Sequence, residues 1–428
     1  MRMPQTPPDF EKILDENRKG LLSKKNISLA LKFNSGYLHW DEVRRRETEG
    51  VDHAKIWAVM KLFRSDSSRS VSVGGVRMIY SYVEDFQRQT HKFDIYSVNL
   101  ISDDGVENNR RMMYSVSSLM EESIASSQIE GANTTIDVAK KMLRDKRAPK
   151  NRAELMIHNN YAAMELIKRR KDEPLTPELM LDVHKVITKG TLDDPSGEGE
   201  FRRNNDIVIS DALTGDVYHR PIDFEKIPWA VMDLCGYINN DDMFVHPLIK
   251  GTILHFMTAY IHPFADGNGR LSRSLFYWYM MKKGYPLIEY LAVSKAIKNH
   301  RGKYDLAYLH SETDGNDITY FIKFNLDCIE ESLNIFFRYL DRKLKEQKAL
   351  EKSVMTFEGI NMRQKMILND AAKDRRPFSI YEVQSKYQIS YQTARTDVLG
   401  LIESGKIEEY GRVGNKKMYM FSDTQRKT

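Results

Sequence analysis

The residue types best suited to chemistry gather in one segment, which runs from His262 to Arg273. It reads His-Pro-Phe-Ala-Asp-Gly-Asn-Gly-Arg, followed by Leu, Ser and Arg. The imidazole of His262 is a base that is mostly neutral near pH 7. Asp266 adds a carboxylate, which is enough to hold Mg²⁺ when phosphates complete the coordination shell. Arg270 and Arg273 add guanidinium groups, whose planar donors suit phosphate oxygens.

The backbone between these side chains is also suited to anions. Gly267, Asn268 and Gly269 accept positive φ, so successive N–H groups can point into one concavity just before a helix begins. The segment thus combines a base, a metal ligand and groups that bind phosphate. Together these predict nucleotidyl transfer to a nucleophile. The plain alternative is a turn between two helices whose His and Arg side chains are merely solvated. Gly-Asn-Gly by itself does not exclude that turn, but the joint occurrence of all these residues favours the chemical interpretation.

Helices must position this segment, and apolar spacing predicts them on both sides of it. Residues 247–261 are expected to form a helix that delivers His262. After a nine-residue loop, a second helix is expected to begin near Leu271 and to end before Gly284. Two further helices are predicted over residues 155–168 and, after an N-cap at Thr176, over residues 179–187. The predicted fold class is therefore mainly α.

At the loop the chain resembles the Fic family. The family signature reads His-x-Phe-x-Asp/Glu-Gly-Asn-Gly-Arg-x-x-Arg, and every fixed position is matched here. The resemblance covers roughly residues 111–340. It implies the helical Fic fold and an ATP-dependent protein adenylyltransferase. Such an enzyme transfers AMP to a Tyr, Thr or Ser hydroxyl of a target protein, with ATP as co-substrate and Mg²⁺ as cofactor, and the chain itself is a further candidate target.

The resemblance implies a role for each side chain of the loop. His262 is expected to be the general base that takes the proton from the target hydroxyl as its oxygen attacks the α-phosphorus. Asp266 is expected to hold Mg²⁺ between the α- and β-phosphates. Phe264 is expected to pack inward and anchor the loop.

The remaining loop residues are expected to bind the nucleotide. Asn268 and the amides of Gly267 and Gly269 would stabilise the developing phosphoryl charge. Arg270 would bind the β-phosphate, and Arg273 the γ-phosphate.

Two other segments of the resembling region carry weaker signals. Within residues 201–221, Ile207, Val208 and Ile209 followed by a turn predict a short β-hairpin. Fic proteins place there a flap that holds the target peptide by strand addition, and a plain structural hairpin is the alternative. Tyr304 and Thr313 fall where relatives close the adenine pocket, and core packing explains them equally well.

The segment from Ser126 to Gly131 resembles the inhibitory motif of the family, Ser/Thr-x-x-x-Glu-Gly/Asn. Glu130 is expected to pair bidentately with Arg273, which would remove the γ-phosphate partner and place negative charge where phosphate should sit. The alternative is an ordinary helix C-terminus that Gly131 ends.

Residues 355–428 read as a separate small domain, after a charged helical linker over residues 341–354. Ser379 opens a capping box and Ser390 caps the next helix, and two strand-like runs follow. Three helices and then a hairpin is the order of a winged helix-turn-helix. DNA binding and a scaffold role are equally compatible with it, and the candidate DNA contacts are Gln392, Thr393, Arg395 and Lys416.

Composition bounds the remaining possibilities. A net charge of +5 over 428 residues is mild and does not require nucleic acid as a partner. No apolar run reaches the length of a membrane span, and the N-terminus lacks the pattern of a signal peptide, so a cytoplasmic protein is expected. Cys235 and Cys328 show no metal or redox spacing. A homo-oligomer is compatible with the sequence but no residue indicates one.

Two other functions remain open at this stage. One is a DNA-binding regulator that uses the Fic region as a nucleotide sensor. The other is a Fic enzyme that removes AMP or transfers another nucleotide. Residues 1–110 carry no recognisable chemistry; Gly74-Gly75 predicts only a turn there, and packing on the helical core is the expected role.

Overall fold

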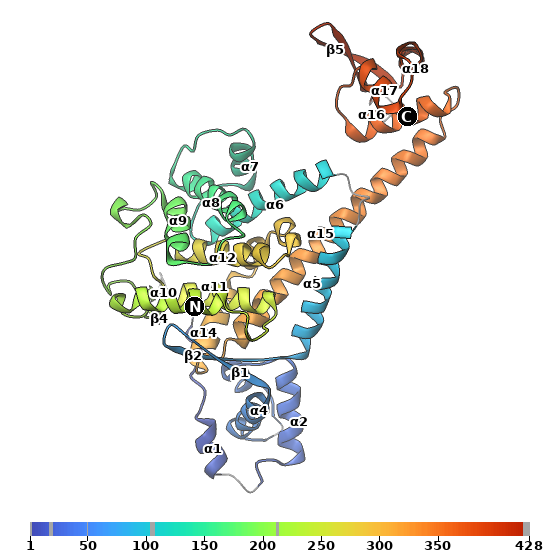
Figure 1. Ribbon diagram of the computed structural model, residues 1–428. Helices are drawn as coiled ribbons and strands as arrows, with labels where there is room; N and C mark the ends of the chain where they lie inside the picture. Colours follow the sequence, from blue (N-terminus) through green and yellow to red (C-terminus); the bar gives the residue numbers. More distant parts are fainter. Residues whose placement is uncertain (1, 17–19, 49, 103–107, 211–213, 423–428) are drawn as a thin grey trace. The chain divides into compact units, whose positions relative to one another are not determined.

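The computed structural model describes residues 2–16, 20–48, 50–102, 108–210 and 214–422 (Figure 1). Residues 211–213 of the predicted flap and 423–428 of the predicted C-terminal domain lie outside this description. The chain divides into two compact units, Met1–Asn334 and Ile335–Thr428. Helices make up most of the described chain, and its sheets are two-stranded. The predicted mainly α fold class is confirmed. No described helix combines the length and the apolarity needed to cross a bilayer.

The first part of the larger unit joins short helices to one hairpin. Gly74 and Gly75 form the turn between the strands with φ of 61° and 75°, a backbone conformation that glycine adopts without steric cost. The predicted turn is therefore confirmed. The elements are α1 (Phe10–Glu16), α2 (Lys24–Ser35), α3 (Trp40–Val43), α4 (His53–Ser67), β1 (Ser68–Val73), β2 (Val76–Ser81) and α5 (Glu84–Ser102).

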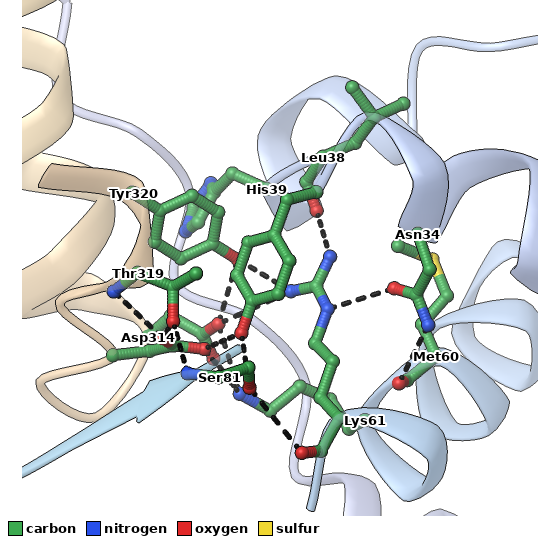
Figure 2. Close-up of polar contacts among 12 residues, drawn as sticks. Asn34, Leu38, His39, Met60, Lys61, Ser81, Asp314, Thr319 and Tyr320 are labelled. Carbon is green, nitrogen blue, oxygen red and sulfur yellow. Dashed lines mark hydrogen bonds and ion pairs between the residues drawn. The ribbon is translucent and has the colours of Figure 1, made fainter. Parts of the chain in front are cut away.

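A buried polar cluster ties this N-terminal part to helices from the far end of the same unit (Figure 2). The ammonium of Lys61, on α4, donates to both carboxylate oxygens of Asp314 at 3.0 Å. Arg64 donates to the hydroxyl of Tyr320 at 2.7 Å, and that hydroxyl donates to Asp314 at 2.9 Å. All four side chains are buried. Charged groups are removed from water only where partners replace it, so these residues hold the N-terminal part firmly on the helical core.

The centre of the unit is an antiparallel pair of helices, α11 (Pro247–Ile261) and α12 (Asn268–Lys282), which Figure 1 shows side by side. Nearly every side chain of both helices is buried, because α6, α8, α9 and α10 pack around them. The surrounding elements are α6 (Asn108–Ile129), α7 (Ile136–Arg144), α8 (Arg152–Arg169), α9 (Pro177–Thr188), α10 (Ile227–Asn239), α13 (Val293–Asn299) and α14 (Arg301–Thr313). Short 3-10 turns lie at Pro195–Gly197, Phe224–Lys226 and Pro286–Tyr290.

The predicted helices are found, with one correction at the loop. The side chain of Thr176 caps α9 by accepting from the Leu179 amide, as expected. Helix α12, however, begins at Asn268 and not near Leu271, so the loop after His262 is shorter than the nine residues expected. The cause is Gly267, whose φ of 87° turns the chain directly into the helix.

The predicted hairpin is present but shorter than expected. It consists of β3 (Ile209–Ser210) and β4 (Val217–His219), paired antiparallel with Ile209 opposite His219. Ile207 and Val208 lie before the strand, so their assignment to it is wrong. In this register Ile207 would face Pro221, which has no amide hydrogen to donate to the ladder.

Helix α15 (Thr319–Met355) starts in the larger unit and continues without a break through the predicted linker at residues 341–354. The smaller unit then contains α16 (Met362–Asp374), α17 (Ile380–Tyr387), α18 (Tyr391–Glu403), β5 (Ile407–Val413) and β6 (Lys416–Phe421). The predicted order of three helices and a hairpin is found, with the expected capping box at Ser379 and N-cap at Ser390. Leu368, Val398, Leu401 and Tyr419 belong to its own buried core.

Candidate active site

His262 stands where α11 ends, and its surroundings leave one ring nitrogen available as a base. The residue has a φ of 51°, which takes it out of the helix. Its Nδ1 lies 3.1 Å from the carbonyl of Ala259. Since a carbonyl only accepts, Nδ1 carries the proton and Nε2 keeps its lone pair. Burial lowers the pKa of His262 to about 4, so the ring is neutral at physiological pH.

Arg202 holds the start of the loop, a role that was not predicted from the sequence. Its backbone amide donates to the carbonyl of Pro263 at 2.9 Å, and its Nε donates to the carbonyl of His262 at 3.0 Å. The guanidinium also donates to the carbonyl of Ile222, beyond the hairpin. The base of the hairpin and the loop are therefore joined through one buried side chain. A lone arginine beside a predicted strand carries no local signal for such a contact.

The interior of the loop is closed by Phe264 and Asn268. Phe264 is fully buried, as expected, and stacks on the ring of His184 at 3.6 Å between centroids. The side chain of Asn268 accepts from the amide of Phe264 at 3.0 Å and donates to its carbonyl at 2.8 Å. Asn268 therefore shapes the loop through its whole amide group, and a direct phosphate contact from it stays a prediction.

Arg270 presents unsatisfied donors from a buried position. Its side chain is fully buried, and Nη1 donates to the carbonyl of Ile187 at 3.0 Å. Among the described residues, Nε and Nη2 have no hydrogen-bond partner. The carboxylate of Asp266 lies 3.7 Å from Nη2, too far for a hydrogen bond. Buried guanidinium donors are normally paired, so this arrangement suits an anionic ligand such as phosphate.

Arg273 contacts the segment that resembles the inhibitory motif. Its Nη2 donates to Oε1 of Glu130 at 2.9 Å and to the carbonyl of Ser126 at 2.9 Å, and its Nε donates to the hydroxyl of Ser126 at 2.9 Å. The expected bidentate pair with Glu130 is not found, because only Nη2 donates to Glu130, Ser126 binds Nε and Nη2, and Nη1 has no hydrogen-bond partner among the described residues. Burial opposes ionisation of Glu130, but the guanidinium groups of Arg273 and Arg301 outweigh it and lower the pKa of the carboxyl.

Glu130 also lies directly against the loop. A Cβ built on Gly269 would stand 2.2 Å from Oε1 of Glu130, so the absence of a side chain there makes room for the carboxylate. Gly131 follows with a φ of 89° and ends the helical segment. The segment is therefore compatible with both interpretations of the sequence motif, an inhibitory motif and an ordinary helix C-terminus. It ends a helix, and it places the carboxylate of Glu130 next to Arg273.

Asp266 lies at the exposed side of the loop, with 51% of its side chain accessible. Its Oδ1 accepts from the amide of Gly267 at 2.5 Å. No group of three or more His, Cys, Asp or Glu side chains among the described residues forms a metal cage. A single exposed carboxylate beside unpaired arginine donors fits Mg²⁺ that takes its other ligands from phosphates and water.

The predicted adenine-pocket residues lie in different surroundings. Tyr304 is buried, and its hydroxyl lies 2.9 Å from Nε2 of His255. The hydroxyl of Thr313 lies 3.2 Å from Nε2 of His39, in the N-terminal part, and donates to the carbonyl of Leu309 at 2.6 Å. Contact of Tyr304 with a nucleotide stays a prediction.

The hairpin is anchored beside the end of α11. His219, in β4, lies 2.8 Å from the carbonyl of Tyr260 and 2.7 Å from the carboxylate of Glu312. Ile207 and Ile209 are half-buried and Val208 is exposed. The flap role of these residues stays a prediction, and their position near His262 is compatible with it.

The candidate DNA contacts lie in the smaller unit. Gln392 and Arg395 are exposed at the start of α18, and Thr393 donates its amide to the hydroxyl of its cap, Ser390, at 3.1 Å. Lys416 is exposed at the start of β6, 5.3 Å from the ring centre of Tyr381. DNA binding stays a prediction, which a gel shift at increasing salt tests directly.

Comparison with known proteins agrees with this geometry. Residues 174–280 match the Fic/DOC family. The chain is 31% identical over 216 residues to a protein adenylyltransferase Fic of Culex quinquefasciatus, and 30% identical over 216 residues to that of Aedes aegypti. These matches cover 49% of the chain and 39% and 40% of the two relatives, so the chain spans about two fifths of their length.

Solved structures show the same fold over most of the chain. A Fic family protein from Desulfovibrio desulfuricans superposes with a TM-score of 0.54 at 18% identity, over 80% of this chain and 98% of that one. A Fic-1 fragment from C. elegans gives a TM-score of 0.53 at 15% identity, over 78% of this chain and 93% of that one. The chain therefore contains a Fic/DOC family domain, built around the loop that starts at His262.

Proposed function

We propose that this protein is an ATP-dependent adenylyltransferase that transfers AMP to a Tyr, Thr or Ser hydroxyl of a target protein. The observation that carries the proposal is the pairing of two features in one short segment. Within the part of the chain that the structure describes, Nε2 of the neutral His262 ring has no hydrogen-bond partner, and neither do the buried Nε and Nη2 of Arg270. The adenylyltransferase names of the relatives from Culex and Aedes support it.

The loop geometry suggests how the reaction proceeds. Nε2 of His262 accepts the proton of the target hydroxyl as its oxygen forms a bond to the α-phosphorus, and the bond from that phosphorus to the bridging oxygen breaks to release pyrophosphate. Arg270 and Arg273 bind the terminal phosphates, next to the N-terminus of α12, where negative charge is favoured. Asp266 would hold Mg²⁺, which neutralises phosphate charge when bound.

Glu130 acts in this proposal as a built-in inhibitor. Its carboxylate occupies Nη2 of Arg273 and stands against Gly269, where the end of the triphosphate is expected. ATP must then displace the carboxylate or bind in a pose unsuited to in-line attack.

Replacing Glu130 by glycine tests both the inhibitor and the activity. Purified Glu130→Gly is expected to incorporate at least about tenfold more label from α-labelled ATP than the parent, because it removes from the phosphate site a hydrogen bond between charged groups, which contributes about 1.5–3 kcal/mol. Mass spectrometry should show an added AMP on the protein itself or on an added target. Label from γ-labelled ATP should not remain on protein. Equal labelling of variant and parent would contradict the inhibitory role.

Replacing His262 by alanine separates chemistry from binding. His262→Ala in the Glu130→Gly protein is expected to abolish AMP transfer, because the base that accepts the proton of the target hydroxyl is removed, while ATP affinity measured by calorimetry stays within about twofold. Loss of ATP binding together with transfer would show that His262 is structural. A chase distinguishes AMP removal. The labelled target is incubated with the enzyme in buffer without labelled ATP or pyrophosphate, and loss of label from the target shows removal.

A further inference from the structure

His184 lies on α9, outside the loop, yet both of its ring nitrogens are engaged with the loop or its neighbours. The side chain is completely buried. Its Nδ1 accepts from the amide of Gly199 at 3.1 Å, and its Nε2 lies 2.8 Å from the carbonyl of Asp266. Because the amide of Gly199 can only donate, Nδ1 must be the acceptor and the ring hydrogen must be on Nε2. His184 therefore donates a hydrogen bond to the backbone of Asp266.

The peptide unit after Asp266 passes this constraint to the carboxylate. A peptide group is planar, so fixing the direction of its carbonyl also fixes the direction of the amide on its other side. That amide belongs to Gly267 and donates to Oδ1 of Asp266 at 2.5 Å. The hydrogen bond from His184 thus fixes the plane of the peptide between Asp266 and Gly267. The amide of that peptide holds the Asp266 carboxylate.

Packing prevents the loop from moving away from this position. The His184 ring stacks on Phe264, with 10° between the ring planes. A Cβ on Gly267 would stand 2.8 Å from Cγ2 of Thr188 and 3.1 Å from Nε2 of His184, so the loop backbone lies as close to α9 as glycine allows. Movement toward α9 is blocked by contact, and movement away from it breaks the hydrogen bond.

We propose that His184 is a positioning residue for the reaction, which orients the Asp266 carboxylate through the peptide between Asp266 and Gly267. The inference rests on the proposed function for its kinetic consequence, but its structural content, an ordered loop, can be measured without any reaction.

A matched pair of amide substitutions separates the two bonds of the ring. The amide nitrogen of Gln reaches the position of Nε2 and can donate to the Asp266 carbonyl, whereas the amide oxygen of Asn reaches only the position of Nδ1 and can accept from Gly199. Both replacements remove the stack on Phe264, so the loss of the ring is common to them. Any difference in activity or loop order between His184→Gln and His184→Asn therefore measures the effect of the hydrogen bond to the Asp266 carbonyl.

In the Glu130→Gly background, His184→Asn is expected to raise the Mg²⁺ concentration for half-maximal AMP transfer about tenfold and to lower kcat, with the KM for the target protein unchanged. His184→Gln is expected to stay within about twofold of the Glu130→Gly protein in the Mg²⁺ concentration for half-maximal transfer, in kcat and in KM. Equal Mg²⁺ dependence in the two variants would overturn the proposal, and so would a raised Mg²⁺ requirement in His184→Gln alone.

Hydrogen exchange supplies a readout that needs no activity. Amides of residues 262–270 are expected to exchange faster in His184→Asn than in His184→Gln, at matching thermal midpoints. Equal exchange in this segment, or a difference that follows only the thermal midpoint, would overturn the positioning role. If the Glu130→Gly protein transfers no AMP at all, the proposed function fails, while the exchange comparison still decides whether His184 orders the loop.

Discussion

His262 combines an unusual backbone conformation with an ordinary side chain. A left-handed conformation costs a residue other than glycine roughly 1–2 kcal/mol. Here the bonds from Arg202 to the carbonyls of His262 and Pro263 oppose relaxation of the chain. The conformation ends α11 and leaves the imidazole beside the loop instead of on the helix surface. At the scale of the residue, strain and burial together produce a base that is fixed in place.

The low pKa of His262 predicts an unusual pH dependence. The ring accepts a proton only when neutral, so transfer is lost as the pH falls through its pKa, which burial lowers to about 4. Glu130 raises this pKa, so its removal moves the acid limb lower still. The acid limb of kcat/KM for Glu130→Gly is therefore expected below pH 5, and not near the ordinary value of 6.5. A rate profile from pH 4 to 8 measures it, and a limb at 6.5 or above would contradict the neutral, buried base.

At the scale of the element, the end of α6 is held by α14 and its neighbour α13. Arg301 donates through Nη1 to the carbonyl of Ile129 at 2.8 Å, and Lys298 donates to the side chain of Gln128 at 2.6 Å. A cation at a helix C-terminus satisfies an open carbonyl and the helix dipole together. The Arg301 contact reaches the backbone next to Glu130 and so holds the turn that carries Glu130 to the loop, whereas Lys298 reaches only a side chain.

Removing the cation at that helix end should weaken the inhibition. Arg301→Gln is expected to raise AMP incorporation about two- to fivefold, which corresponds to roughly 0.5–1 kcal/mol for a partly exposed charge contact. The same change in the Glu130→Gly background should have no effect, because Arg301 acts through Glu130. Lys298→Met, which leaves the carbonyl of Ile129 capped, is the matched control. An equal gain in both backgrounds would show that Arg301 acts on the nucleotide directly.

At the scale of the whole molecule, the N-terminal part is bound to the larger unit by charges as well as by apolar packing. Lys61 and Asp314 are separated by 253 positions and are both buried. Removing one partner of a buried pair leaves a charge without solvent or counterion, which costs far more than an exposed pair contributes. The N-terminal part is thus an integral layer of the larger unit.

Lys61→Met is expected to destabilise the larger unit by about 3–5 kcal/mol. The double variant Lys61→Met/Asp314→Asn should recover part of that loss, because it removes the carboxylate that Lys61→Met leaves without its ammonium partner. Urea unfolding followed by tryptophan fluorescence measures the free energy of unfolding of the larger unit. The signal comes from that unit because all four tryptophans lie in residues 1–334, namely Trp40, Trp57, Trp229 and Trp278. Asp193→Asn breaks a pair whose carboxylate is 93% exposed and serves as the control, with an expected change below about 0.5 kcal/mol. Unchanged unfolding of Lys61→Met would contradict the binding role of the cluster.

Local chemistry allowed much of the molecule to be predicted. Thr176, Ser379 and Ser390 cap helices as expected, because a cap depends on a side chain and an amide two or three residues away. The hairpin was predicted too long, because the length of a strand depends on its pairing with the opposite strand, which local sequence does not report. The start of α12 was predicted too late, because only the observed turn at Gly267 shows where helical geometry begins.

The sequence by itself determined the chemical inventory of this protein, namely His262, Asp266, Arg270 and Arg273 in one segment of twelve residues. Only the tertiary structure decided which residues hold that loop. His184 and Asp266 are 82 positions apart, and Glu130 and Arg273 are 143 apart. Periodicity and capping report neighbours within a few residues, whereas contacts over such separations depend on how whole helices pack. The choice among acceptors in a buried cluster depends on that packing as well, which is why Ser126 accepts from Nε and Nη2 of Arg273 while only one oxygen of Glu130 does so.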